Sequence, residues 1–111
     1  MFDDFDNENR DVRYELEGQS FIWDKIKYDA NLNKHKITFE EAATIFTDDR
    51  TEYYSDEENS ADEERFIAFG ISGRFNILIV CHCMRENETV IRIISARKAE
   101  KHEQKRRKKE K

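Results

Sequence analysis

The sequence predicts an α+β fold in which two N-terminal helices pack on an antiparallel sheet and a further helix ends the chain. A capping box at Thr38 and Glu41, followed by apolar residues at helical spacing, predicts one of these helices. Strand-like runs separated by short turns follow it and favour a sheet meander. With 111 residues, eight of them Phe, the chain has enough apolar material for one small core.

The first helix is expected to follow a short strand over residues 21–23. Asp24 is a suitable N-cap, and the helical pattern runs to about Lys36. Two faces of this helix carry apolar side chains, so the sequence leaves its buried side open. In the second helix the apolar residues follow the i, i+3, i+4, i+7 pattern, at Phe39, Ala42, Ala43 and Phe46.

The expected strands are 51–55, 66–71, 75–83 and 89–95, with an acidic loop at 56–63 and turns at 72–73 and 85–88. The last strand is expected to lead directly into a helix, with Ser95 as its N-cap. Arg97 and Lys98 would then lie in the first helical turn, where the helix dipole favours acids. A local rule broken in this way is typical of a functional site.

Charge is distributed unevenly along the chain. Charged residues make up 41% of the sequence and the mean hydropathy is −0.99, so part of the chain must lie in solvent. Residues 1–20 hold seven acids and two bases, whereas residues 92–111 hold ten bases and three acids. We therefore expect residues 1–20 to be an acidic flexible extension, 21–99 the folded domain and 100–111 a basic helical tail. Alternating Val12, Tyr14 and Leu16 leave an edge strand open as the alternative for part of the extension.

The sequence predicts a soluble, cytoplasmic protein without membrane contacts. No apolar run approaches the roughly 18 residues needed to cross a bilayer, and the acidic start does not resemble a signal peptide. Cys81 and Cys83 lie two residues apart on one expected strand and so point to the same face, which favours reduced thiols in a core. His82 points to the other face, so this run forms no zinc site, and we predict no metal and no cofactor.

Residues from about 21 to 103 resemble the BrnT family in order and spacing. The matching residues are Trp23, Asp24, Lys27, Asn31, Lys34, His35, the run 39–42, residues 64–66, Gly70 and the run 92–99. Members of this family are ribonuclease toxins of bacterial type II toxin-antitoxin systems. The resemblance implies a RelE-like fold and translation arrest through cleavage of cellular RNA. It also implies a BrnA-like ribbon-helix-helix antitoxin, which neutralises the toxin and is its only link to operator DNA.

Metal-independent RNA cleavage requires a proton acceptor for the 2'-hydroxyl, cations around the phosphate and an acid for the leaving oxygen. We predict that Arg97 and Lys98 clamp the phosphate and that Arg92 supports them as an RNA contact. Pairing of these cations with the acidic loop is the alternative.

Three further residues are candidates for catalysis. Glu64 and Arg65 would place an acid and a base on opposite faces of the sheet, or simply form a polar start of the strand. His35 titrates near neutral pH, although its helical face, shared with Tyr28, equally suits a hydrogen-bonded core histidine. Lys34 and the tail residues Lys101 and Arg106 are predicted RNA contacts whose affinity depends on salt.

A second interpretation is a catalytically inactive BrnT-like module that acts with the antitoxin as a co-repressor. Lys36 and Asn59 stand where the family often has Gly and His, and the overall acidity also favours this interpretation.

Overall fold

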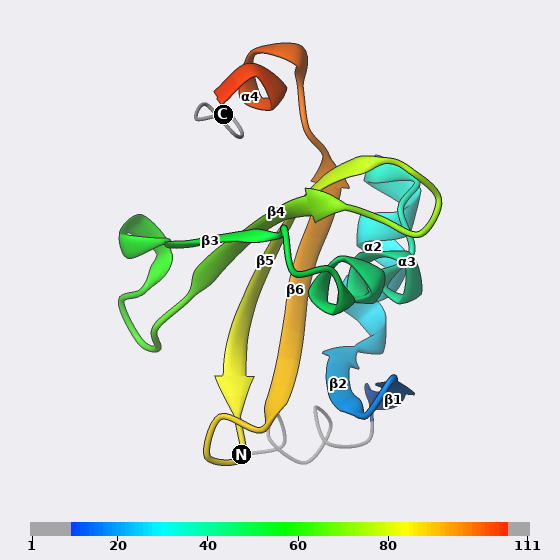
Figure 1. Ribbon diagram of the computed structural model, residues 1–111. Coiled ribbons are helices and arrows are strands. Elements are labelled where there is room, and N and C mark those ends of the chain that lie inside the picture. The colour runs from blue at the N-terminus through cyan, green and yellow to red at the C-terminus, as the bar shows by residue number, and fades with distance from the viewer. Residues whose placement is uncertain (1–9, 107–111) are drawn as a thin grey trace.

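The computed structural model describes residues 10–106 and confirms the α+β class (Figure 1). The regular elements in chain order are β1 (Asp11–Leu16), β2 (Gln19–Asp24), α2 (Lys25–His35), α3 (Phe39–Thr44), β3 (Glu52–Ser55), β4 (Phe66–Ile71), β5 (Ile77–Arg85), β6 (Val90–Lys98) and α4 (Lys101–Arg106). Two short 3-10 turns, η1 (Ile45–Thr47) and η2 (Glu57–Asn59), follow α3 and β3.

The six strands form one mixed sheet in the order β1-β2-β6-β5-β4-β3. Neighbouring strands are antiparallel except β2 and β6, which pair in parallel through Ser20, Phe21 and Ile22. The expectation of a purely antiparallel sheet is therefore wrong. The reason is topological, because α2 and α3 carry the chain from β2 to the far edge of the sheet, and three hairpin steps bring it back beside β2.

Strands, not helices, lead the chain, which corrects the expected order. β1 and β2 form a hairpin in which Val12 lies opposite Trp23 and Tyr14 opposite Phe21. Val12, Tyr14 and Leu16 pack against the core, so residues 10–20 are not the flexible extension that their acidity suggested. The remainder of that extension, residues 1–9, and the tail residues 107–111 lie outside the described residues.

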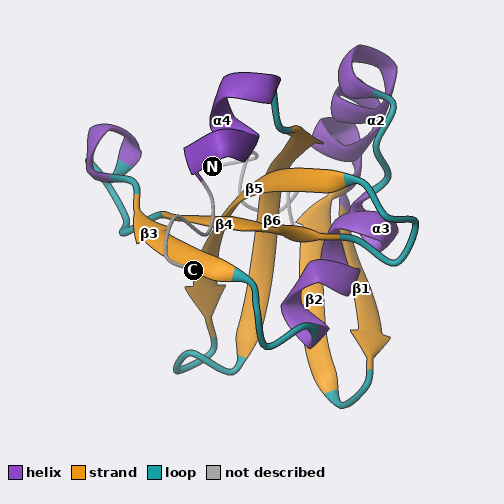
Figure 2. Cartoon of the chain, turned by 45° about the horizontal axis from the view of Figure 1, so that its top comes forward, coloured by secondary structure: helices purple, strands orange, loops and turns teal. Residues whose placement is uncertain are grey.

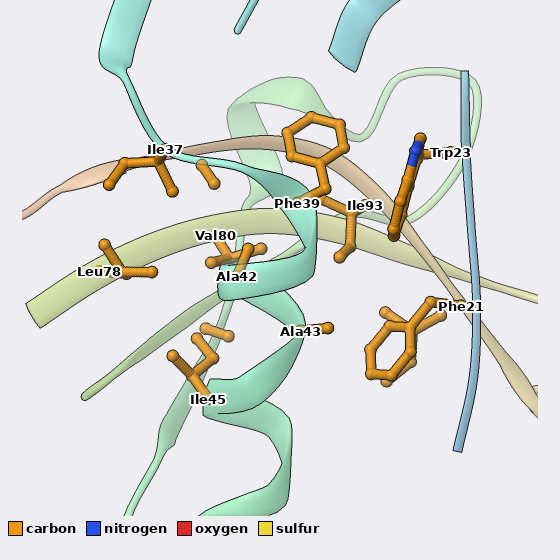
Figure 3. Packing of buried hydrophobic residues seen from close by; sticks show 13 residues of the cluster. Phe21, Trp23, Ile37, Phe39, Ala42, Ala43, Ile45, Leu78, Val80 and Ile93 are labelled. Atoms are coloured by element: carbon orange, nitrogen blue, oxygen red, sulfur yellow. The ribbon is translucent and has the colours of Figure 1, made fainter. Parts of the chain in front are cut away.

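Helices α2 and α3 lie together on one face of the sheet, and α4 lies apart from them (Figure 2). The core fills the space between the two helices and the sheet (Figure 3). Its largest fully buried side chains are Trp23, Phe21, Phe39, Ile37, Ile45, Leu78, Ile93 and Val80. Burial of such side chains contributes roughly 1.5–3 kcal/mol each, which makes this the main stabilising cluster.

Two of the three predicted helix N-caps, Asp24 and Thr38, are confirmed. The Asp24 carboxylate accepts a hydrogen bond from the Lys27 amide at 3.0 Å, and the Thr38 hydroxyl accepts one from the Glu41 amide at 3.0 Å. The Glu41 side chain accepts hydrogen bonds from Ser72 at 2.6 Å and Asn76 at 2.7 Å. Glu41 therefore ties the start of α3 to the turn between β4 and β5.

Asn31 joins α2 to β6 at Ala96. This residue follows the part of β6, Val90 to Arg92, that pairs with β2. Its amide nitrogen donates to the Ala96 carbonyl at 2.9 Å, and the Ala96 amide donates to the Asn31 side-chain oxygen at 3.1 Å. This pair of bonds satisfies the same groups that a neighbouring strand would satisfy. Helix α2 is thereby fixed along β6.

Strand β6 continues to Lys98, so the helix expected to start at Ser95 is absent and α4 begins only at Lys101. Ser95 lies opposite Cys81 and Arg97 opposite Ile79 in the ladder with β5, and the register shifts by one residue at Ile94. Local capping signals were overridden by long-range pairing, because the Ala96 backbone is bound by a side chain 65 positions away.

Candidate functional site

Four arginines line hollows on the sheet face opposite α2 and α3, which we call the arginine face: Arg65, Arg85, Arg92 and Arg97. Strand alternation places them there, because in the β5–β6 ladder Arg92 lies opposite Cys83 and Arg97 opposite Ile79. The alternate pair, Val80 and Ala96, is buried beneath the helices. Arg85 and Arg65 stand at the end of β5 and immediately before β4.

Three adjoining hollows cross the arginine face. The first, of about 180 Å³, is lined by Arg65, Arg85 and Arg92 together with Asp24 and Lys27. The second, of about 320 Å³, is lined by Arg65 and Arg97. The third, of about 390 Å³, is apolar and is lined by Tyr54, Ile67, Phe69, Ile79 and Glu103. Arg65 and Ile94 line both of the first two, and Ile67 and Ile79 line both of the last two, so the three form one groove, which we call the arginine groove.

Three of the four arginines pair with carboxylates: Arg85 with Glu63, Arg92 with Asp11 at 3.2 Å, and Arg97 with Glu103 at 2.8 and 2.9 Å. Among the described residues no such ion pair is present for Arg65, which lies where the first two hollows meet. Partly exposed ion pairs contribute only about 0–1 kcal/mol, so an incoming phosphate can replace these carboxylates. The groove is therefore suited to a polyanion.

The Arg97–Glu103 pair connects α4 to the arginine face. Hydrogen bonding from Arg97 lowers the pKa of Glu103 to about 2, and the same bond raises the pKa of Arg97. Burial, followed by the nearby charge of Arg92, lowers the pKa of Arg85. Cations are thus crowded in the first hollow, where a bound anion would relieve their repulsion.

Arg97 and Lys98 do not form the expected joint clamp. They are consecutive residues of β6, so their side chains point to opposite faces of the sheet. Arg97 lines the groove, whereas the exposed Lys98 lies opposite the core residue Leu78. The expectation was wrong because the strand continues past Ser95 instead of giving way to a helix.

Glu64 and Arg65 point to opposite faces, as alternation predicts. Arg65 lines the arginine groove, whereas Glu64 is exposed and lines another hollow with Phe66 and Met84, which adjoins the first hollow at Glu63. The carboxylates that line the arginine groove are those of Asp24, Asp56, Glu63 and Glu103.

Helix α2 places Lys27 in the lining of the arginine groove, whereas Lys34 and His35, at the end of the helix, line none of its three hollows. Asn31 faces β6, and Lys27 lies one turn earlier, where it lines the first hollow beside Arg92. Lys34, seven residues after Lys27, projects from the same side of the helix. Both lysines thus extend the positive charge along the edge of the arginine face.

His35 is half-buried at the end of α2. Within the described part of the chain its imidazole has no hydrogen-bond partner, so a hydrogen-bonded core histidine is not what the structure shows. Burial lowers its pKa, and the charges of Lys34 and Arg97 lower the pKa further. The imidazole is therefore neutral at pH 7 and able to accept a proton.

The remaining candidates occupy varied positions. Lys101 is exposed at the start of α4; Arg106 ends this helix, and its side chain lies outside the described residues. His82 is buried in edge contact with Phe46, with ring centroids 4.9 Å apart, and is a core residue.

Both cysteines carry free thiols, but they lie on the arginine face and not within the main core. Cys81 lines the groove, and Arg85 contacts the sulfur of Cys83 at 2.9 Å. Burial raises the pKa of both thiols, which keeps them protonated. Among residues 10–105 no three His, Cys, Asp or Glu side chains come together as a metal site.

Sequence reasoning missed Lys27 and Arg85 as site residues and Glu103 as the partner of Arg97. Arg85 lies on the same face of β5 as Cys81 and Cys83. The expected strand ended at residue 83, so the sequence did not place Arg85 on this face. Lys27 and Lys34 lie seven residues, or two helical turns, apart, and this spacing predicts that both project from the same side of the helix. No local pattern marks Glu103, because its position depends on how α4 folds back.

A family model described as "Ribonuclease toxin, BrnT, of type II toxin-antitoxin system" matches residues 23–103. The matched range contains all four arginines of the arginine face as well as Lys27, His35 and Glu103. Strand β1 and most of β2 precede it. No curated protein matches the chain. Among the described residues, no helix has the length and apolar character needed to cross a membrane.

Proposed function

The chain belongs to the BrnT family of ribonuclease toxins from type II toxin-antitoxin systems, and we propose from this that it is an endoribonuclease that cleaves cellular RNA to arrest translation. Membership of a type II system implies an antitoxin partner. We propose that this partner is a BrnA-like ribbon-helix-helix protein, and that the toxin reaches operator DNA only through it.

The arginine groove is the observation that carries the nuclease proposal. RNA binding depends on positive charge placed to follow the phosphate backbone. Arg65 and Arg97 line one hollow and Arg92 an adjoining one, so successive phosphates have cations within the same groove. Lys34 and Lys101 are proposed to extend this charge, and Arg106 is proposed as a further RNA contact.

Within the groove, we propose that Arg65 and Arg97 bind the scissile phosphate. A guanidinium contacts two phosphate oxygens at once and stabilises the charge that develops as the 2'-hydroxyl attacks. His35, neutral and near Arg97, accepts the proton of that hydroxyl, the bond between phosphorus and the 5'-oxygen breaks as the 2'-oxygen bonds to phosphorus, and the leaving 5'-oxygen takes a proton from solvent water. Because the arginines supply the positive charge, cleavage proceeds without a metal. Glu64 and Lys98 face away from the groove and lie outside the reacting centre.

The alternative function is an inactive module that serves as a co-repressor with the antitoxin. One observation favours it: three of the four groove arginines already have carboxylate partners within the chain. In this case the arginine face would serve the antitoxin and not RNA.

Induction of the chain alone in bacteria tests the proposal, with growth and the integrity of cellular RNA as the measurements. The unaltered chain should stop growth and degrade RNA, and Arg65→Gln should abolish both effects. Arg74→Gln is the matched control, because Arg74 is exposed in the turn between β4 and β5 and lines none of the groove hollows. Normal growth with intact RNA for the unaltered chain would refute the nuclease proposal and favour the co-repressor.

The metal-free mechanism has a separate test with the purified chain. Cleavage of a labelled RNA should proceed at the same rate in excess chelator, and His35→Gln should slow it at pH 7. Cleavage that appears only after a divalent metal is added would contradict the mechanism while leaving the nuclease activity intact.

A further inference from the structure

The apolar end of the arginine groove has a composition unlike the rest of it. Ile67, Phe69 and Ile79 form its floor, and Tyr54 forms one wall from the edge strand β3. Tyr54 is 51% exposed. An aromatic ring this exposed, beside an aliphatic floor, offers a surface for a planar ligand.

This apolar hollow is continuous with the arginine-lined part of the groove. The second hollow, lined by Arg65 and Arg97, shares Ile67 and Ile79 with the apolar one. A ligand that spans the two must therefore present an anionic group beside an apolar, planar group. A nucleotide has this composition, with its phosphate next to a base that stacks on aromatic side chains.

Charge also decides which part of the nucleotide enters the hollow. Among the described residues Glu103 is its one charged lining residue, and its carboxylate accepts hydrogen bonds from Arg97 and from the Glu100 amide. A carboxylate at the rim repels a phosphate and leaves the arginines on the other side to bind it. The volume of about 390 Å³ lies within the range of roughly 300–1,000 Å³ that small-molecule sites have.

We propose that the hollow formed by Tyr54, Ile67, Phe69 and Ile79 is a subsite for an unpaired nucleobase, which stacks on Tyr54 while the adjoining phosphate lies on Arg65. This inference rests on the proposed function, because it assumes that the groove binds RNA. A base within a duplex cannot enter the hollow without leaving its stack, so single-stranded RNA is the substrate class.

The test measures binding of the full chain to a fluorescein-labelled, single-stranded 2'-O-methyl RNA, which has no free 2'-hydroxyl to support cleavage. Tyr54→Ala should weaken binding by about tenfold, as expected when one stacking platform is lost. Tyr54→Phe keeps the ring and should bind as the unaltered chain does. A strand of the same length with abasic sites should bind more weakly, and Tyr54→Ala should not weaken it further.

Tyr53→Ala is the matched control. Tyr53 is 52% exposed and adjacent to Tyr54, but it points to the opposite face, where it contacts Phe46. Its loss should leave binding unchanged. Thermal unfolding of each variant shows whether the fold is retained, and Tyr54→Phe separates loss of the ring from loss of the hydroxyl, which donates to Glu52 at 2.6 Å.

Equal binding by Tyr54→Ala and Tyr53→Ala, with Arg65→Gln still defective, would overturn the base subsite and leave the RNA groove standing. The hollow would then be open to an apolar side chain of the antitoxin. Unchanged binding by Arg65→Gln would instead reject the RNA groove itself.

Discussion

Asn31 shows how one buried side chain fixes the position of the candidate site. It is 8% exposed, and its side-chain amide donates to the Ala96 carbonyl and accepts from the Ala96 amide. Lys27 and Lys34 lie on either side of it along α2, so the same contact that anchors the helix also sets where these lysines meet the arginine face. Asn31 thus anchors the helix and also positions Lys27, which lines the arginine groove.

Replacement of Asn31 by Ala should lower the free energy of unfolding by about 2–4 kcal/mol. The change leaves the buried Ala96 amide and carbonyl without partners, and each unsatisfied group costs roughly 1–3 kcal/mol. Urea denaturation measures the effect. Asn33→Ala, at an exposed position of the same helix, should change stability by less than about 0.5 kcal/mol, and an equal loss in both variants would contradict this role of Asn31.

The Arg97–Glu103 pair predicts how α4 responds to acid. The pKa of Glu103 is lowered from 4.5 to about 2, so its stabilising contribution is fully present above pH 4.5 and is lost as the pH falls toward 2. NMR titration of the Glu103 carboxyl should give this low midpoint, and in Arg97→Gln the midpoint should return toward 4.5. A midpoint near 4.5 in the unaltered chain would show that the pair does not form.

Helix α2 illustrates the scale of single elements, because its two ends are set by different kinds of residue. Asp24 caps its start, as predicted from the sequence. At its end Lys36 adopts a left-handed conformation with φ of 62° and ψ of 28°, and its amide bonds to the Leu32 carbonyl. Glycine takes this conformation without the steric cost that a side chain incurs.

Lys36→Gly should therefore raise the free energy of unfolding by about 0.5–1 kcal/mol. Thermal unfolding followed by circular dichroism is the measurement. Lys34→Gly is the opposite control, because a glycine inside the same helix costs roughly 1 kcal/mol. A lower melting temperature for Lys36→Gly would mean that the lysine side chain stabilises the helix end by contacts of its own.

Local signals predicted the elements whose form depends on neighbouring residues. The cap at Thr38 and the bounds of β4 followed directly from the sequence. The last strand was misread because the capping signal at Ser95 is local, whereas the bonds that hold Ala96 in β6 come from Asn31. No local sequence pattern predicts the parallel pairing of β2 with β6 either.

The candidate site was predictable to a similar extent. The sequence predicted Arg65, Arg92 and Arg97 as site residues. It did not predict that they share one sheet face, because this requires the bulge at Ile94 and the continuation of β6 past Ser95. The resemblance to the BrnT family identified candidate residues but did not show where they lie in the fold. Pairing across the sheet decided that Lys98 lies apart from Arg97, and no spacing rule for a helix start would have given that result.

At the scale of the whole molecule, the two faces of the sheet have separate roles. One face is covered by α2 and α3 and supplies the core, and the other holds four arginines in a groove that Glu103 of α4 borders at one end. The net charge of −5 gives no hint of this groove, because the 25 acids are spread along the whole sequence. An acidic protein thereby presents a local surface suited to RNA.

Salt dependence of RNA binding tests the groove most directly. For single strands the slope of log K against log salt changes by about 0.7 for each phosphate contact. We expect Arg65→Gln to reduce the magnitude of this slope by about 0.7, while Arg74→Gln leaves it unchanged. The same slope for the unaltered chain and Arg65→Gln would contradict phosphate binding at Arg65, and with it the central claim that the arginine face binds RNA.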